Sequence, residues 1–427
     1  MVKILAKKEF LGEKNLILKG NFISHLEYYI YWAFMPFIFE WFFSDNLEYY
    51  TSVVAWSKLF FSYSKILGAL FFGFLAIKYS PSKMLIYSFL GLTFFTFLLI
   101  FVPKYKSIGI FATYILITLR VAQSFFQGGE YVISNIRIMD LKQKSNIYEI
   151  LEQKLPYNLT IMFAISFAYL IPTIISFFLV NMNHLIWRGV LILLVIVMVI
   201  ICFTRNHYRN KIEYSSVLNI FSRDFFKKKI INFDFIIRFL RLTILNAFAY
   251  SIYVITFFFI DYFLAGINKN LQLTKLVSYN SYLLVLDIII VFLFTKIIIY
   301  FKMNLQHILA FLSLLTIVIM IPIFRILPDL SYYSINMVKV FFVFLGVTTS
   351  LVQNVFSYQI IRHLQEKYLI HSLSYIVGHR LVGGSMAIIM WALWSKFHNT
   401  DFLAAVFIIL AILNLIAVLG KIEHKDF

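Results

Sequence analysis

Apolar segments long enough to cross a bilayer recur along the whole chain and are separated by polar links. Because about 20 apolar residues span the hydrocarbon core as an α-helix, each segment predicts one transmembrane helix. Two links are longer and basic, around 136–156 and 205–234, and the second divides the helices into six and six. The twelve helices are expected at residues 20–43, 52–77, 84–102, 108–135, 157–180, 187–204, 235–263, 279–300, 306–327, 334–358, 372–396 and 401–420.

This pattern predicts an all-α integral membrane protein made of two six-helix halves. Such an array is typical of transporters built from parallel repeats. The link at 205–234 is too short to bury a core of its own, and residues 1–19 lack the apolar core and cleavage site of a secretory signal. The expected parts are a cytoplasmic N-terminal segment at 1–19, a first bundle at 20–204, a cytoplasmic central loop at 205–234, a second bundle at 235–420 and a cytoplasmic tail at 421–427.

Composition agrees with a membrane location. Hydrophobic residues make up 61% of the chain and charged residues 14%, and the mean hydropathy is +0.85, which excludes an ordinary water-soluble fold. Of the 38 lysines and arginines, 24 fall on predicted inner segments and 5 on outer loops. This bias places both termini in the cytoplasm, so the net charge of +18 needs no nucleic-acid partner. Tryptophans near the outer helix ends are expected at the membrane interface; they are Trp41, Trp56, Trp187, Trp391 and Trp394.

The fourth predicted helix carries polar residues spaced three and four apart, which form one face. This polar seam consists of Arg120, Gln123, Gln127, Glu130, Ser134 and Arg137. Lipid does not tolerate such a face, so it borders either a water-filled pathway for substrate and protons or another polar helix. Gly128 and Gly129 beside it permit close helix approach.

Other helices add intramembrane candidates. Glu27 and Tyr31 share a face of the first helix, and Asn246 and Tyr250 share a face of the seventh. In a medium of low dielectric, Glu27 either binds and releases a proton during a conformational cycle or pairs with a basic residue of a neighbouring helix. Asp287, Lys339 and the His379–Arg380 pair are further ionisable groups, each of which serves transport or forms a static interhelical pair.

Enzyme chemistry has little support in the sequence. The histidines show no metal-binding spacing, no phosphate-binding loop is present, and the one cysteine, Cys202, excludes a disulfide framework. We therefore expect neither an enzyme nor a cofactor or metal site. The expected partners are a small solute, protons and the lipid bilayer, with the chain acting as a monomer.

Several strings resemble the metabolite:proton symporters of the major facilitator superfamily. Arg120–Tyr131 (RVAQSFFQGGEY) is similar to that family's fourth-helix signature, Glu27-Tyr28 with Tyr31 to its first helix, and Lys65–Gly73 (KILGALFFG) to its second. The recognisable resemblance covers about the first 205 residues. It implies a major facilitator fold that works by alternating access, with proton-coupled uptake of small zwitterionic or organic-acid solutes across a bacterial inner membrane. It also implies that Glu27, Arg120, Gln123 and Glu130 occupy the family's polar positions.

The loop after the second helix departs from the family pattern. After Gly73 the chain reads Ile77, Lys78, Tyr79, Ser80, Pro81 and Ser82, so the usual acid, turn glycine and first arginine are missing. Three functions stay open. The chain is a proton-coupled symporter with Glu27 and Glu130 as proton carriers, a non-transporting paralogue or receptor, or an exchanger of phosphorylated anions bound by Arg120, Lys339 and Arg380.

Overall fold

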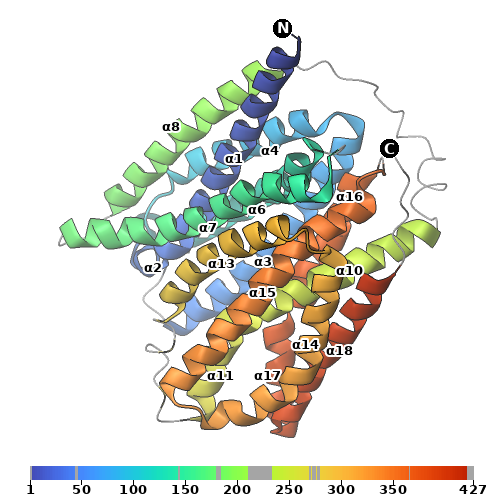
Figure 1. The fold of residues 1–427 in the computed structure, drawn as a ribbon. Helices are drawn as coiled ribbons and strands as arrows, with labels where there is room; N and C mark the ends of the chain where they lie inside the picture. Colours follow the sequence, from blue (N-terminus) through green and yellow to red (C-terminus); the bar gives the residue numbers. More distant parts are fainter. Residues whose placement is uncertain are drawn as a thin grey trace. The chain divides into compact units, whose positions relative to one another are not determined.

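In the computed structural model, every regular element of the described residues is a helix (Figure 1). These residues are 2–43, 47–142, 145–178, 184–209, 233–268, 271, 276, 279–364 and 366–420. Most of the central loop predicted at 205–234 and the tail predicted at 421–427 lie outside them.

The helices follow the predicted order. The first half of the chain contains α1 (Val2–Ala33), α2 (Met35–Phe42), α3 (Leu47–Lys78), α4 (Pro81–Leu99), α5 (Tyr105–Ile108), α6 (Ile110–Asp140), α7 (Ile147–Phe178) and α8 (His184–Arg209). The second half contains α10 (Phe233–Val254), the π-helical segment η2 (Ile255–Phe259), α11 (Ile260–Ile267), α13 (Asn280–Tyr300), α14 (Leu305–Ile326), the 3₁₀ turn η3 (Leu327–Asp329), α15 (Tyr332–Ile361), α16 (Lys367–Tyr375), the π-helical segment η4 (Ile376–Gly383), α17 (Met386–Phe397) and α18 (Thr400–Leu419).

Three predicted spans are each built from more than one helical segment. The first consists of α1 and α2, which are interrupted at Phe34, two residues before Pro36. Proline lacks the N–H that would continue the helical ladder. The seventh and eleventh spans continue through η2 and η4. In the described chain, 11 helices are long and apolar enough to cross a membrane, and the broken first span completes the expected twelve. The predicted fold class is confirmed.

The described residues divide into two compact units. The first unit is Met1–Leu141 with Pro156–Phe221, and the second is Lys142–Leu155 with Ser222–Phe427. The first turns of α7 therefore group with the second unit, whereas the rest of this helix belongs to the first. This division falls at the boundary between the polar, basic link expected around 136–156 and the apolar span expected to begin at 157.

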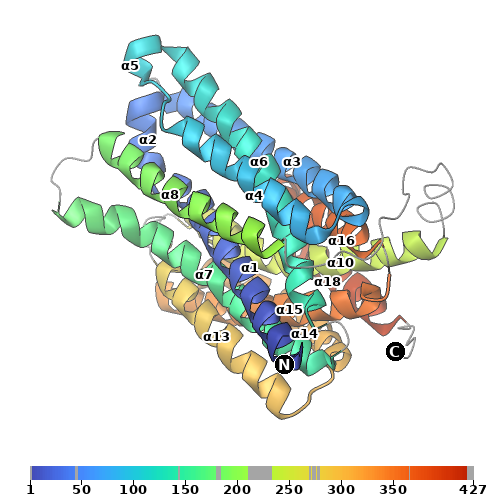
Figure 2. The same ribbon diagram turned by 90° about the horizontal axis from the view of Figure 1, so that it is seen from above.

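Glycines allow α3 and α6 to pack closely within the first unit. Figure 2 shows α3, α6 and α4 lying side by side. A Cβ atom at Gly128 would overlap the backbone carbonyl of Lys65, and one at Gly68 would overlap the carbonyl of Phe125. The backbones meet at both points, so the close approach expected at Gly128 is confirmed and has a counterpart on α3.

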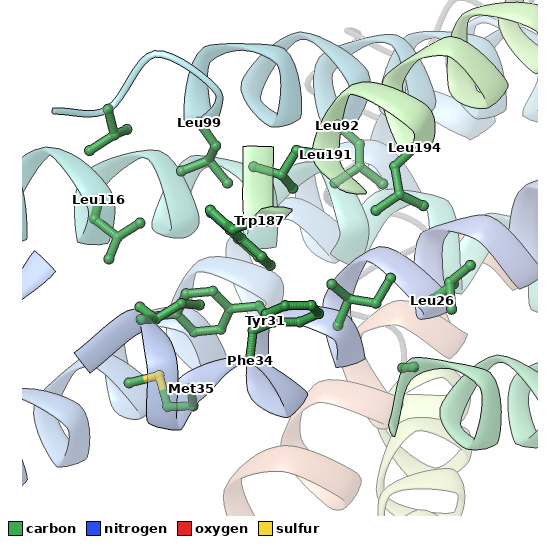
Figure 3. Packing of buried hydrophobic residues seen from close by; sticks show 14 of the residues in the cluster. Leu26, Tyr31, Phe34, Met35, Leu92, Leu99, Leu116, Trp187, Leu191 and Leu194 are labelled. Atoms are coloured by element: carbon green, nitrogen blue, oxygen red, sulfur yellow. The ribbon is translucent and has the colours of Figure 1, made fainter. Parts of the chain in front are cut away.

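The apolar core of the first unit surrounds Trp187 (Figure 3). Its indole is 1% exposed and packs against Phe34, with ring centroids 5.2 Å apart. Trp41 is buried in the same core. The expectation that these two tryptophans lie at the membrane interface is wrong, because the helix faces that carry them pack inward rather than toward lipid.

Candidate functional site

The polar seam of α6 faces the interior of the first unit. Arg120, Gln123, Gln127 and Glu130 are all at most 3% exposed. Each points at a neighbouring helix. Gln127, for example, donates a hydrogen bond of 2.9 Å to the backbone carbonyl of Ser24 on α1. The seam therefore borders other polar groups, and its charged residues belong to separate clusters along α6.

The first cluster joins α1, α4 and α6. Arg120 forms a buried ion pair with Glu27 and donates to Oε1 of Gln123 at 2.8 Å. The amide nitrogen of Gln123 in turn donates to Oε1 of Glu27 at 3.0 Å and to the hydroxyl of Thr96 at 2.9 Å. Nε of Arg120 is buried without a hydrogen-bond partner. The cluster is thus closed around Glu27 but retains one unused donor on the arginine. Sequence reasoning missed Thr96, since an uncharged threonine within an apolar helix gives no signal.

Aromatic rings on α1 carry two cations. The guanidinium carbon of Arg120 lies 4.2 Å from the ring centroid of Tyr31, and Nζ of Lys65 lies 3.4 Å from the ring centroid of Tyr28. Trp32 packs edge-on against both tyrosines, with ring centroids 5.3 and 6.4 Å away. Tyr31 is fully buried, whereas Tyr28, Trp32 and Lys65 are half-buried. This aromatic surface is therefore a place where a positive charge is held by ring faces.

The second cluster is centred on Glu130. Both of its oxygens bind the terminal nitrogens of Arg205 on α8, at 2.6 and 2.9 Å. Arg205 also donates to the backbone carbonyls of Leu16 and Leu85, and the hydroxyl of Ser88 donates to Glu130 at 3.3 Å. Two parallel N–H···O bonds between a guanidinium and a carboxylate are among the strong hydrogen bonds of proteins. The geometry is that of an interhelical clamp.

Arg205 was assigned from the sequence to the central loop, and this assignment is wrong. It belongs to α8 and is 6% exposed. A signal was present, because Arg205 continues a buried face whose members recur every three or four residues: Trp187, Leu191, Leu194, Met198 and Ile201. Lys154 was likewise counted with the inner loops but is fully buried in α7.

A third pair lies where α6 ends. Nε and Nη2 of Arg137 bind the two carboxylate oxygens of Glu13, at 2.8 and 3.1 Å. Ser82, in the first turn of α4, donates to the same carboxylate at 3.1 Å. Glu13 lies in the segment that was predicted to precede the first span. The loop after the second span lacks the acid expected there, and Ser82, the last residue of the departing string, contacts a carboxylate from α1.

The second unit holds the remaining predicted residues. Asn246 on α10 accepts a hydrogen bond of 3.0 Å from Gln353 on α15. The ring of Tyr250 stacks on that of His379, with centroids 3.5 Å apart, and the guanidinium of Arg380 lies 6.0 Å from the Tyr250 ring. His379 and Arg380 belong to η4, and π-helical segments frequently occur at functional sites. The structure thus brings Tyr250 together with Arg380 within this unit.

Lys339 forms a buried ion pair that sequence reasoning anticipated only in part. Its ammonium binds Oδ1 of Asp261 on α11 at 2.7 Å and the carbonyl of Leu276 at 3.3 Å. Asn280, the first residue of α13, donates to the other oxygen of Asp261 at 3.0 Å. Both charged side chains are fully buried. Among the described residues, no group of three or more histidine, cysteine or acidic side chains is arranged to hold a metal ion.

Comparison with known proteins identifies the family to which this fold belongs. The family model of the Major Facilitator Superfamily matches residues 20–388. Over 74 residues the chain is 38% identical to the proline/betaine transporter of Escherichia coli (strain K12). Over the same length it is 36% identical to the glycine betaine/proline/ectoine/pipecolic acid transporter OusA of Dickeya dadantii (strain 3937). Each match covers 17% of this chain and 15% of the relative, so the chain matches only a small part of these relatives' length.

Solved structures extend the likeness of fold over nearly the whole chain. FucP in its outward conformation has a TM-score of 0.68 at 12% identity and covers 96% of this chain and 98% of its own. The proton:xylose symporter XylE gives a TM-score of 0.68 at 12% identity, with 97% and 95% covered. A human organic anion transporter gives 0.66 at 10%, with 96% and 99% covered. Sequence identities this low support a likeness of fold alone. The family match, with which this likeness agrees, establishes that this multi-pass membrane protein belongs to the major facilitator superfamily.

Proposed function

We propose that the chain is a secondary active transporter that carries a small zwitterionic metabolite together with protons by alternating access. The observation that carries this proposal is the buried Glu27–Arg120 pair bridged by Gln123. A substrate carboxylate replaces Glu27 on Arg120, whose Nε has no partner. Glu27, once released, no longer has a cation beside it and takes up a proton.

The aromatic surface beside this pair supports the zwitterionic class. The ammonium of Lys65 lies over the ring of Tyr28. The quaternary or secondary ammonium of a substrate would make the same kind of contact. Cations are recognised in this way by aromatic rings when the site is shielded from water. The proline and betaine named in the relatives' descriptions have both an ammonium and a carboxylate, so one molecule offers a group for the ring face and a group for Arg120.

The exchanger of phosphorylated anions has less support. It needs several uncompensated cations, yet Arg120 and Lys339 are each paired with a buried carboxylate. The non-transporting paralogue was motivated by the missing loop acid, and Glu13 supplies a carboxylate at that loop. We therefore prefer transport to either alternative and propose no enzymatic activity and no cofactor.

The cellular setting follows from the sequence. We propose a bacterial inner-membrane location with both termini in the cytoplasm, since 24 of the 38 basic residues fall on one side of the predicted topology. The two six-helix halves of this proposal are residues 20–204 and 235–420. Asn246, Tyr250 and Arg380 are the residues through which we expect the second half to contact the substrate or its proton pathway. The proposed unit is a monomer.

Reconstitution tests the function. The full chain in lipid vesicles with an acidic exterior should accumulate radiolabelled proline or glycine betaine, and a protonophore should abolish this accumulation. Glu27→Gln should lose it, whereas Glu152→Gln, which alters an exposed ion pair with Lys296, should not. Counterflow that is stimulated by phosphorylated solutes and indifferent to the pH gradient would instead establish the exchanger.

A further inference from the structure

Asp287 differs from the other buried carboxyl groups of the membrane spans. Glu27, Glu130 and Asp261 each bind a buried arginine or lysine. Asp287 on α13 is 4% exposed, makes no ion pair in the described part of the chain, and has its Oδ1 buried without a hydrogen-bond partner. A charged carboxylate without a partner is energetically unfavourable at such a buried position.

The helix places this carboxyl in the protein interior. The buried residues of α13 form a single stripe of Leu283, Asp287, Val291, Thr295 and Ile298, and α13 packs against α15. Residues on the other faces, such as Tyr282, Val285 and Ile289, are exposed and apolar, as expected for a helix that faces lipid. Asp287 therefore sits in the middle of an otherwise mostly apolar helix contact.

The other charged groups of α13 and α15 have partners away from Asp287. Lys339, the cation of α15, binds Asp261 and the carbonyl of Leu276. This pair lies at the level of Asn280, seven residues or about 10 Å along α13 from Asp287. Lys296 on α13 is half-exposed and contacts Glu152. The other ionisable groups of α15 are tyrosines, Tyr332 and Tyr333 in its first turn and Tyr358 near its end.

Burying an ionised carboxyl in low dielectric without a partner costs several kcal/mol even after relaxation, whereas the neutral acid avoids this cost. We infer that Asp287 is a proton-binding site of this transporter, holding a proton when α13 and α15 are packed together and releasing it when water enters between them. The step is a simple proton exchange with water, and no covalent bond other than O–H forms or breaks.

This inference rests on the proposed function for its physiological meaning and adds a proton-binding group in the second unit to Glu27 in the first. Packing α13 against α15 requires a protonated Asp287, and opening the contact allows the carboxyl to ionise. The conformational cycle then takes up and releases one proton at this residue. The carboxyl groups of Glu27 and Glu130 have arginine partners in this structure, whereas Asp287 has no ion-pair partner among the described residues.

A spectroscopic experiment tests the site without any substrate. Infrared spectra of the full chain in lipid at neutral pH should contain the carbonyl stretch of a protonated carboxyl, and Asp287→Asn should remove it. Glu152→Gln, which removes an exposed carboxyl group of the same unit, should leave the band unchanged. Absence of the band from the parent protein, or its persistence in Asp287→Asn, overturns the inference. If Asp287→Asn fails to fold, Asp287→Glu should shift the band, and an unshifted band overturns the inference equally.

Transport separates failure of this site from failure of the function. With proline or glycine betaine as probes, Asp287→Asn should lose accumulation driven by a pH gradient, and this loss should exceed any loss of gradient-free counterflow. Unchanged accumulation in the variant overturns the role of Asp287 and leaves symport standing. If the parent protein accumulates neither probe, the proposed function fails, and the infrared result still decides whether Asp287 binds a proton.

Discussion

Arg205 and Glu130 are bound to each other through both terminal nitrogens and both carboxylate oxygens, in the interior of the first unit. The same guanidinium reaches backbone carbonyls on α1 and α4. One side chain of α8 thereby fastens three other helices. The pair is almost completely removed from solvent, so its two charges depend on each other.

We predict that removing one partner destabilises the protein strongly. Arg205→Met leaves Glu130 buried and unpaired, and breaking a buried pair typically costs about 3–5 kcal/mol. The double variant Arg205→Met/Glu130→Leu should recover part of the loss, because no isolated charge remains. Thermal unfolding in detergent checks this order. A double variant less stable than both single variants would contradict the view that the unpaired charge causes the damage.

Glu13 should hold the start of α1 against α4 and α6. Its ion pair with Arg137 is partly solvent-exposed, so its loss should cost only about 0.5–1 kcal/mol. The clearer effect should be local, because Glu13→Gln frees the beginning of α1, and limited proteolysis before residue 20 should become faster.

A relocated acid provides the control for this contact. Ser82→Asp in the Glu13→Gln background places a carboxylate near Arg137 from α4 and should restore part of the stability, while proteolysis near α1 should remain fast. Equal proteolysis of Glu13→Gln and the parent chain would refute the anchoring role of Glu13.

These contacts show how far the sequence could lead. The spacing of polar residues from Arg120 to Arg137 predicted the buried seam, because helical periodicity determines which residues share a face. It could not predict that Glu130 meets Arg205 and that Arg137 meets Glu13, since partners across a helix contact depend on helix arrangement and not on period.

The membrane fold was predictable for a related reason. In lipid, a helix satisfies the hydrogen bonds of its own backbone. The lengths of the apolar segments were therefore enough to predict the twelve membrane crossings. Amphipathic residues near helix ends were harder to place. Trp187 could face lipid or core equally well by position, and Asp261 was overlooked because it falls in the last predicted turns of a long span.

The aromatic surface of α1 predicts that two substitutions of Tyr28 change the KM by different amounts. Tyr28→Phe keeps the ring on which Lys65 rests, so the KM for glycine betaine should change little. Tyr28→Leu removes the ring face and should raise KM by a factor that corresponds to about 1–2 kcal/mol, the strength of a shielded cation–π contact. Transport kinetics in vesicles measure both. Equal KM values for the two variants would show that the substrate's cation binds elsewhere.

The close approach of α3 and α6 predicts a sharp difference between glycines. A Cβ at Gly128 would overlap a backbone carbonyl, that of Lys65, and backbone atoms cannot rotate away as side chains do. Gly128→Ala should therefore separate the two helices and cost about 1–3 kcal/mol, as overpacking does. Gly68→Ala should act in the same way. Because either change opens the same contact, the double variant should lose less than the sum of the two losses.

Gly189 on α8 is the matched control, because a Cβ there would meet nothing within 4 Å. Gly189→Ala should be neutral or stabilising by up to about 1 kcal/mol, since alanine is the better helix former. Thermal unfolding of the four variants in one detergent compares these effects directly. If Gly128→Ala and Gly189→Ala unfold at the same temperature, the backbones of α3 and α6 are not in contact at Gly128. The Glu27–Arg120 network, to which α6 contributes Arg120 and Gln123, would then not be held in place by this helix contact.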